Sequence, residues 1–497
     1  MRFFPIFTLT RQRENLYYII TAIIFSLSAW IVFKKLYPYP FITIDSYYYI
    51  GAAFENANAC SWPIGYSKFI RLVGFLSHSH TLLVTIQYLI LQASLIYFFI
   101  TIREILQLRK ITSLILFIVL FLNPLFIYGS NHIMSDLLFC SLSLCWICTL
   151  LRILKFPTLN HIIMQAILLT AIFSIRYTAL FFPIITVIVL LISKQSVKRK
   201  IIGIILTFLL LGLFIQFTRI KMEEVSGVRQ FPSAAGWKQA CNALYMYANI
   251  VETDTAPVPE RFKMLHQLTK SYFKNQHTHV DLYHIDQEFT TDSFYVAAYE
   301  SPLMQYLRIK KGEDVDIFDF KNIAPLGPFF NSYGNYLITH HPIPYLLYVV
   351  LPDITAYISP FAEIYGMPND LHYLWSNYMG TITKNWFGIN NISIPESLIN
   401  IRGYILRPYP TIFSIIHLTF FISLIVFSCL KYYKKIDQIK KYALATTISI
   451  CLSNFIFTVL SAASVLRFQF MFIILEFTVT LFFIELIYKN SPLNQEN

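Results

Sequence analysis

The sequence predicts an α-helical protein that crosses a membrane many times. Of its 497 residues, 56% are hydrophobic and only 13% are charged, which is about half of the roughly 25% found in soluble domains. The polar residues are too few to cover a water-soluble globule of this size. The same composition excludes a disordered chain and a small disulfide scaffold.

We expect about ten transmembrane helices, because ten apolar runs approach the length that crosses about 30 Å of hydrocarbon. The runs are 16–36, 81–101, 112–128, 133–151, 161–175, 177–193, 201–218, 409–430, 442–462 and 464–487. The segment 343–360 is also apolar, but Pro352 and Asp353 interrupt it. We expect that segment to form a helix at the membrane interface or inside an exported domain.

The orientation follows from lysine and arginine, which favour short loops on the cytoplasmic side. Basic residues fall on alternate loops when the N-terminus is placed inside. Those expected in the cytoplasm are Arg2, Arg11, Arg13, Arg103, Arg109, Lys110, Arg152, Lys155, Lys194, Lys198, Arg199, Lys200, Lys431, Lys434, Lys435, Lys440 and Lys441. The exceptions on the outer side are Lys34, Lys35, Lys68 and Arg71. The basic excess therefore reflects topology and does not indicate a nucleic-acid partner.

This topology divides the chain into three parts. Residues 1–218 form a seven-span core, whose first outer loop covers 37–80. Residues 219–408 form an exported insert, mostly helical and of α or α+β type. The insert carries 18 of the 27 acidic residues, as a solvated domain requires. Residues 409–497 supply three more spans.

Acidic residues are rare before residue 219, and two of them lie at the membrane boundary. Asp45 follows the first span in FITIDSYYYIG, and Asp136 begins the fourth span in GSNHIMSDLLF. An ionisable group at such a depth usually faces a cavity and serves a function. A solvated loop carboxylate or an acid at a helix N-terminus is the alternative for each.

Cations are expected at the same level. Arg176 in FSIRYTALFFP and Arg467 in SAASVLRFQFMF lie on the outer side, contrary to the positive-inside bias. His132 precedes Asp136 by four residues, which is one helical turn if the fourth span begins early. A guanidinium suits phosphate recognition, so these groups match a lipid-linked phosphate at the outer interface. Structural Asp–Arg ion pairing between helices is the alternative.

The order and sidedness of these motifs resemble the GT-C superfamily of integral-membrane glycosyltransferases. In particular, the chain resembles bacterial enzymes of the protein O-mannosyltransferase and lipid A aminoarabinose transferase type. The segments that carry it are IDSYYYI with Asp45, WPIGYSKFIRL with Tyr66, MSDLLF with Asp136, IRYTAL with Arg176, and the arginine of the last span, Arg467. The resemblance covers about 1–220 and, more loosely, 409–487. The insert motif GWKQACNALYMY, with Trp237, is also similar to bacterial members.

The resemblance implies transfer of a sugar from a polyprenyl-phosphate donor to a glycan, lipid or protein acceptor. The reaction would occur at the outer, periplasmic face of the cytoplasmic (inner) membrane, among membrane lipids. Asp45 would be the catalytic base, and Asp136 would orient the donor or the acceptor. The candidate substrate-binding residues are Arg176, Arg467, His132, Tyr66 and Trp237. The two arginines would stabilise the departing phosphate.

The first loop departs from the superfamily pattern in a way that concerns metal binding. Some members have an Asp-x-Asp-like pair there that helps to bind a divalent metal, whereas Ser46 and Tyr47 follow Asp45 in this chain. We therefore predict neither a metal nor another cofactor. The segment QHTHVDLYHID, 276–286, contains three histidines, but we interpret it as an exposed polar segment.

Three further residues have structural interpretations. Cys60 and Cys241 both fall on the expected outer side, where oxidising conditions permit a disulfide between them. Glu476 lies in the middle of the last span, and we expect a buried, hydrogen-bonded carboxyl group there.

Two other functions stay open from the sequence: a polysaccharide polymerase or ligase, and a transporter of lipid-linked glycans. A transporter would show charges spread through the middle of the membrane and short loops at both faces. The discriminating residue is Asp45, which belongs to the glycosyltransferase pattern.

The topology gives a first testable prediction. In a variant without native cysteines, Asp281→Cys should react with a membrane-impermeant thiol reagent added from outside. Lys434→Cys is the matched control and should react only after the membrane is permeabilised. Labelling of position 281 from the cytoplasm alone would contradict both the topology and the site assignment.

Overall fold

The protein is a helical, multi-pass membrane protein in the computed structural model. The structure describes residues 13–232, 234–275, 295, 298–315, 319–360, 378–389, 395–461 and 464–489. Within these ranges the regular structure is helical, and one isolated β-bridge joins Phe41 to His132. Eight helices of the described residues are long and apolar enough to cross a bilayer. The predicted fold class is thereby confirmed at this level.

The eight candidate spans follow the apolar runs of the sequence. They are α2 (Arg13–Leu36), α5 (His80–Leu106), α6 with α7 (Lys110–Phe121 and Pro124–Ser130), α8 (Ser135–Lys155), α11 (Val197–Ser226), α22 with α23 (Glu396–Leu406 and Tyr409–Cys429), α24 (Gln438–Ser461), and η6 with α25 (Leu466–Gln469 and Phe470–Lys489). Two other expected spans are shorter apolar helices, α9 (Leu159–Ile175) and η1 with α10 (Tyr177–Phe181 and Phe182–Ile192). Their crossing of the membrane stays a prediction.

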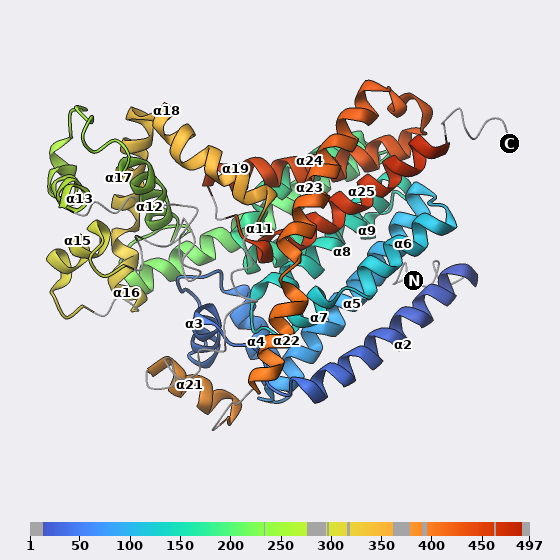
Figure 1. The fold of residues 1–497 in the computed structure, drawn as a ribbon, viewed down its shortest axis with the longest axis horizontal. Coiled ribbons are helices and arrows are strands. Elements are labelled where there is room, and N and C mark those ends of the chain that lie inside the picture. Colours follow the sequence, from blue (N-terminus) through green and yellow to red (C-terminus); the bar gives the residue numbers. More distant parts are fainter. Residues whose placement is uncertain are drawn as a thin grey trace.

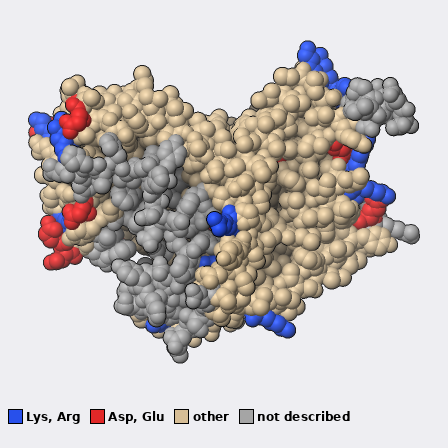
Figure 2. Space-filling model, viewed as in Figure 1, with Lys and Arg blue, Asp and Glu red and all other residues tan. Residues whose placement is uncertain are grey.

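The burial of these helices separates the centre of the bundle from its periphery. In α8, 89% of the most apolar stretch is buried, whereas the corresponding share is 22% in α2 and in α11. The peripheral helices expose large aliphatic side chains, such as Ile24 and Leu213. A continuous surface of this kind is stable against lipid and costly against water. Figure 2 shows the same property as a wide, mostly tan area over the bundle, with the red atoms and most of the blue atoms toward the two ends of the molecule.

The predicted cytoplasmic loops gather at one end of the bundle. Arg103, near the end of α5, forms an ion pair of 3.3 Å with Glu14 at the start of α2. Lys440, at the start of α24, donates a hydrogen bond of 2.8 Å to the side chain of Gln107. These contacts lie at the end away from the insert helices in Figure 1. The alternation of basic loops thus corresponds to a real separation in space, while the side of the membrane stays a prediction.

The described part of the insert is helical and has its own aromatic-rich core. Its elements are α12 (Ala235–Tyr247), η2 (Glu260–Phe262), α13 (Lys263–Asn275), α15 (Pro302–Lys311), α16 (Phe320–Ile323), η3 (Ala324–Leu326) and α17 (Gly327–His340). Helices α12 and α17 pack closely because each has a glycine at the contact. A Cβ atom on Gly236 would lie 1.8 Å from the carbonyl oxygen of Gly327. A Cβ atom on Gly334 would lie 2.8 Å from the backbone of Gln239.

The apolar segment after the insert core is helical, as predicted. It consists of α18 (Pro342–Tyr345), a π-helical turn η4 (Leu346–Val350) and α19 (Leu351–Ile358). The Tyr345 hydroxyl donates to the carbonyl of Leu460 at 3.0 Å, so this segment docks on the end of α24. Its position relative to the membrane stays a prediction.

The first loop folds into two helices, α3 (Ile44–Phe54) and α4 (Gly65–Gly74). Helix α4 lies directly on the end of α9, because a Cβ atom on Gly65 would be 2.4 Å from the Ser174 hydroxyl. Helix α21 (Tyr378–Phe387) covers the loop from the other side, and its Trp386 stacks on His78 with ring centroids 4.3 Å apart. The loop is therefore held between the bundle and the later part of the insert.

The close contact between α12 and α17 gives a prediction on stability. Gly236→Ala should lower the free energy of unfolding by about 1–3 kcal/mol, since the added methyl group overlaps backbone that cannot rotate away. Gly212→Ala in α11 is the matched control, because no atom lies within 4 Å of the added Cβ. Thermal unfolding of the purified protein in detergent checks both variants. Equal midpoints would show that the two helices separate easily.

Candidate functional site

Four charged side chains from distant parts of the chain form one continuous ion-pair network. Arg467 Nη1 lies 2.7 Å from Asp45 Oδ2 and 3.8 Å from Asp136 Oδ2. Arg176 Nη1 contacts the other oxygen of Asp136, Oδ1. The order of the network is Asp45, Arg467, Asp136, Arg176, so positive and negative groups alternate. The structure thus brings together the two acids and two arginines that the sequence singles out.

Helix ends place three of these four groups, and the fourth, Arg467, lies in the turn η6 just before α25. Asp45 is the second residue of α3, behind a Thr43 N-cap, and Asp136 is the second residue of α8. Both carboxylates therefore lie near the positive end of a helix dipole. Arg176 is the C-cap of α9, in an extended conformation with φ −149° and ψ 130°. Its cation lies at the negative end of that helix, so each of these three charges matches the helix end that carries it.

An aromatic ring holds the two guanidinium groups near each other. The Arg176 Cζ lies 3.9 Å from the ring centroid of Phe468, and the Arg467 Cζ lies 4.7 Å from the same centroid. Cation–π attraction offsets part of the cost of keeping two like charges close in a dry environment. Sequence reasoning missed Phe468, although it adjoins Arg467, because an aromatic residue in an apolar run gives no separate signal.

The network is mostly buried but still reachable from one side. The side chain of Asp136 is 5% exposed, those of Arg176 and Arg467 are each 13% exposed, and that of Asp45 is 23% exposed. The sulfur of Met134 lies 3.8 Å from Arg467 Nη1. Asp45 is therefore the member of the network that is most accessible to solvent.

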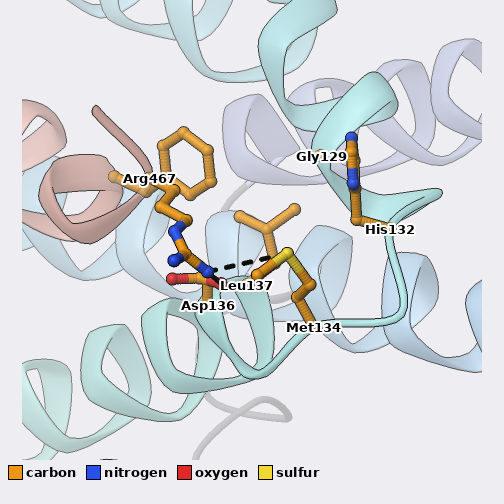
Figure 3. Close-up of a pocket in the computed structure, with 7 residues that line it drawn as sticks. Gly129, His132, Met134, Asp136, Leu137 and Arg467 are labelled. Atoms are coloured by element: carbon orange, nitrogen blue, oxygen red, sulfur yellow. Dashed lines mark hydrogen bonds and ion pairs between the residues drawn. The ribbon is translucent and has the colours of Figure 1, made fainter. Parts of the chain in front are cut away.

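A small cavity lies beside the network. It is lined by Gly129, His132, Met134, Asp136, Leu137, Arg467 and Phe470, and its volume is about 10 Å³. That volume is close to the minimum for one water molecule. Figure 3 shows Arg467 pointing toward Asp136 and Met134, with His132 at the opposite side of the cavity. The cavity cannot admit a sugar or a phosphate group without rearrangement.

His132 lines this cavity, but not in the way the sequence suggested. Its spacing from Asp136 would be one helical turn if the fourth span began early, but α8 begins only at Ser135. The reason is the bridge to the first loop: Phe41 N–H donates to the Asn131 carbonyl at 2.8 Å, and Ile133 N–H donates to the Phe41 carbonyl at 3.2 Å. Burial, together with the nearby Arg402 and Arg467 cations, holds the pKa of His132 well below its usual range. The imidazole is therefore neutral at pH 7.

Tyr66 is fully buried and stabilises the backbone next to the site. Its hydroxyl donates to Gln87 Oε1 at 2.8 Å. The amide of Gln87 in turn donates to the carbonyls of Ser130 and His132 at 3.0 and 2.9 Å. Tyr66 thus fixes the connection that leads into α8. Its hydroxyl is engaged in this role, and it is not among the residues that line the cavity.

Tyr49 is a further residue that sequence reasoning missed. Its hydroxyl lies 3.0 Å from the Ser135 hydroxyl and thereby joins α3 to the start of α8. Burial raises the pKa of Tyr49, and the nearby Asp45 carboxylate raises it further. The signal was present in the sequence as the run Tyr47–Tyr49 after Asp45, but the run does not tell which ring faces inward.

Trp237 lies apart from the charged network. It is 3% exposed within the insert core, its ring packs edge-on against Phe330 at 4.4 Å, and its indole N–H donates to the Ile323 carbonyl at 2.9 Å. The structure therefore does not bring this candidate substrate-binding residue to the site, and gives it a packing role in α12.

The two cysteines that the sequence allowed to pair are not joined by a disulfide. The Cys60 thiol donates to the Trp62 carbonyl at 3.0 Å within the first loop. Burial raises the pKa of Cys60 to about 12, so it is not a reactive thiolate. Cys241 lies in the core of the insert, on α12.

A second polar cluster lies within the spans, between α23 and α25. Glu476 is 1% exposed and its carboxylate lies 2.6 Å from His417 Nδ1, which confirms the expected buried, hydrogen-bonded carboxyl group. His417 Nε2 lies 2.8 Å from Gln469 Oε1, and the Gln469 amide donates to the Tyr357 carbonyl at 3.1 Å. This orientation of the amide requires a proton on Nε2.

The described part of the chain contains no cluster of side chains suited to binding a metal ion. No group of three His, Cys, Asp or Glu side chains within those residues could hold a metal ion. The histidine-containing segment 276–286 lies outside the described residues. The absence of a metal cofactor stays a prediction from the first-loop sequence.

Comparisons of the chain with protein-family models, with curated proteins and with solved structures gave no match. The class that fold and site define is thus a helical multi-pass membrane protein with a buried, alternating ion-pair network at one end of its bundle.

Proposed function

We propose that the protein is a membrane glycosyltransferase. It moves a sugar from a polyprenyl-phosphate donor to an acceptor hydroxyl on the outer side of the cytoplasmic membrane. The observation that carries the proposal is the meeting of Asp45 and Asp136 with Arg176 and Arg467 at one point beside the first loop. Sugar transfer from a phosphate needs a base for the acceptor hydroxyl and positive groups for the departing phosphate, and this network contains both kinds of group.

The roles follow from position. Asp45, the most exposed of the four, accepts the proton of the acceptor hydroxyl. The oxygen of that hydroxyl forms a bond to the anomeric carbon of the donor sugar. The bond from that carbon to the phosphate oxygen breaks, and the lipid phosphate leaves with the electron pair. Arg176 and Arg467 stabilise the departing charge. Asp136, between the two arginines, orients them.

The neutral His132 fits this scheme as a hydrogen-bonding residue on the cavity wall. Because its pKa is well below the usual range, it adds no third positive charge beside the arginines at pH 7. It can donate from one ring nitrogen and accept at the other, which suits sugar hydroxyl groups.

A transporter of lipid-linked glycans is the second candidate, and one observation favours it. The buried His417–Glu476 pair lies within the spans, where a transporter could use it to carry a proton. Transfer of labelled sugar by the purified protein separates the candidates, because a transporter leaves the bond between sugar and phosphate intact. A polysaccharide polymerase or ligase is separated by its need for a glycan donor in place of a single sugar on the lipid.

The assignment of the base gives a prediction. Asp45→Asn should insert and still bind the donor, but transfer sugar at least about a hundredfold more slowly, because the amide cannot accept the proton. The measurement is transfer from a labelled polyprenyl-phosphate sugar by the purified protein, with and without a chelator. Glu55→Gln, an exposed acid at the end of the same helix, is the control and should retain the wild-type rate. A wild-type rate in Asp45→Asn would remove Asp45 as the base.

The assignment of the phosphate site gives another prediction. Arg176→Lys should raise the donor KM by on the order of tenfold, since an ammonium group cannot make the bidentate hydrogen bonds that a guanidinium makes to a phosphate. The acceptor KM should change little. Arg229→Lys, whose side chain is 49% exposed, is the matched control. An unchanged donor KM in Arg176→Lys would leave Arg176 with the structural role of pairing Asp136.

A further inference from the structure

In this structure the guanidinium of Arg467 is already paired with two carboxylates, which leave no space for another anion. Arg467 Nη1 is 2.7 Å from Asp45 Oδ2 and 3.8 Å from Asp136 Oδ2, and the adjoining cavity holds about one water molecule. A phosphate group has no room beside Arg467 in this arrangement. Any anion that binds this guanidinium must take the place of a carboxylate that is already there.

Of the two carboxylates, Asp45 is the one that can give way. Asp136 is 5% exposed, is paired with Arg176 as well, and belongs to the central helix α8. Asp45 is 23% exposed and belongs to α3 in the first loop. Removing Asp136 would leave two adjacent guanidiniums without the anion between them, whereas removing Asp45 leaves the Asp136–Arg176 pair in place.

We propose that the donor phosphate and the Asp45 carboxylate compete for Arg467, so that donor binding itself releases the catalytic base. This inference rests on the proposed function and adds a regulation of the same site. Before the donor binds, Asp45 is neutralised by the guanidinium. After the phosphate takes over Arg467, Asp45 is free to accept the acceptor proton. A carboxylate separated from a cation accepts a proton more readily.

This competition sets the order in which the two substrates bind. While Asp45 is paired with Arg467, an acceptor or a water molecule that enters alone meets a carboxylate whose Oδ2 is already held by the guanidinium. The base becomes available only when a sugar donor is in place, so the donor must bind first. No bond is made or broken in this step, and one anion replaces another at the same cation.

The test measures binding of a polyprenyl phosphate without a sugar to the full-length protein in lipid nanodiscs. Asp45→Asn should bind it at least about fivefold more tightly than the wild type, because the competing charge is gone while Arg467 remains. A partly buried charge-assisted pair is worth on the order of tenfold in an equilibrium constant. The matched control is Glu55→Gln, which removes one exposed negative charge from the same helix and should bind like the wild type.

The possible results separate the inference from the proposed function. Equal affinity of wild type and Asp45→Asn, or weaker binding by the variant, would overturn the competition while leaving a donor site. Tighter binding by Glu55→Gln as well would assign the effect to net charge and also overturn it. Failure of the wild type and of both variants to bind polyprenyl phosphate would remove the proposed function. Inorganic phosphate, the second probe, should bind far more weakly, and equal binding would reject a lipid ligand.

A folding defect in Asp45→Asn would not prevent the test. Size-exclusion profiles and thermal midpoints identify misfolded protein, and Asp45→Ser removes the same charge with a smaller side chain. Arg467→Gln gives an independent measurement, since it should weaken polyprenyl-phosphate binding in the wild-type background. It should also abolish the affinity gain of Asp45→Asn in the double variant. A gain that persists without Arg467 would overturn the competition.

Discussion

The cost of placing charge near a membrane is the constraint on which this structure depends. A buried guanidinium or carboxylate alone is expensive, and it is tolerated when opposite charges and hydrogen bonds surround it. The chain meets this condition by alternating Asp45, Arg467, Asp136 and Arg176, so that every charge in the network touches the opposite one. Four segments that are far apart in sequence must therefore meet at one point.

The helices are arranged so that this meeting is fixed from several sides. The bridge between Phe41 and His132 ties the first loop to the start of α8, and the close approach of Gly65 to Ser174 ties it to the end of α9. Gln469 anchors the turn η6, which carries Arg467, to His417 in α23. The charges are thus positioned mainly by neutral contacts, which hold the ends of the helices in place.

The sequence predicted the class of fold and the members of the network better than their geometry. Acidic residues are rare in this chain, and arginines on the expected outer side run against the positive-inside bias. Asp45, Asp136, Arg176 and Arg467 could therefore be found without a structure. The early helix start that would put His132 one turn before Asp136 does not occur, because its neighbours pair with a distant loop, a contact that no local pattern encodes. Trp237 was grouped with the site on a motif, whereas tertiary packing places it in the core of the insert. The close helix contacts depend on which glycines face each other, and this also needs the fold.

The turn that carries Arg467 also connects the insert to the site. Tyr357 of α19 receives a hydrogen bond from Gln469 through its carbonyl and one from Asn454 through its hydroxyl. Because α19 continues directly from the helix that docks on α24, a displacement of this segment must strain or move η6. Asp136 has no comparable tie to this segment among the described contacts. The described contacts therefore connect this segment of the insert with the turn that carries Arg467, whose pair with Asp45 is the most exposed link of the network. The link that donor binding is proposed to open is thus also the one that the insert can reach.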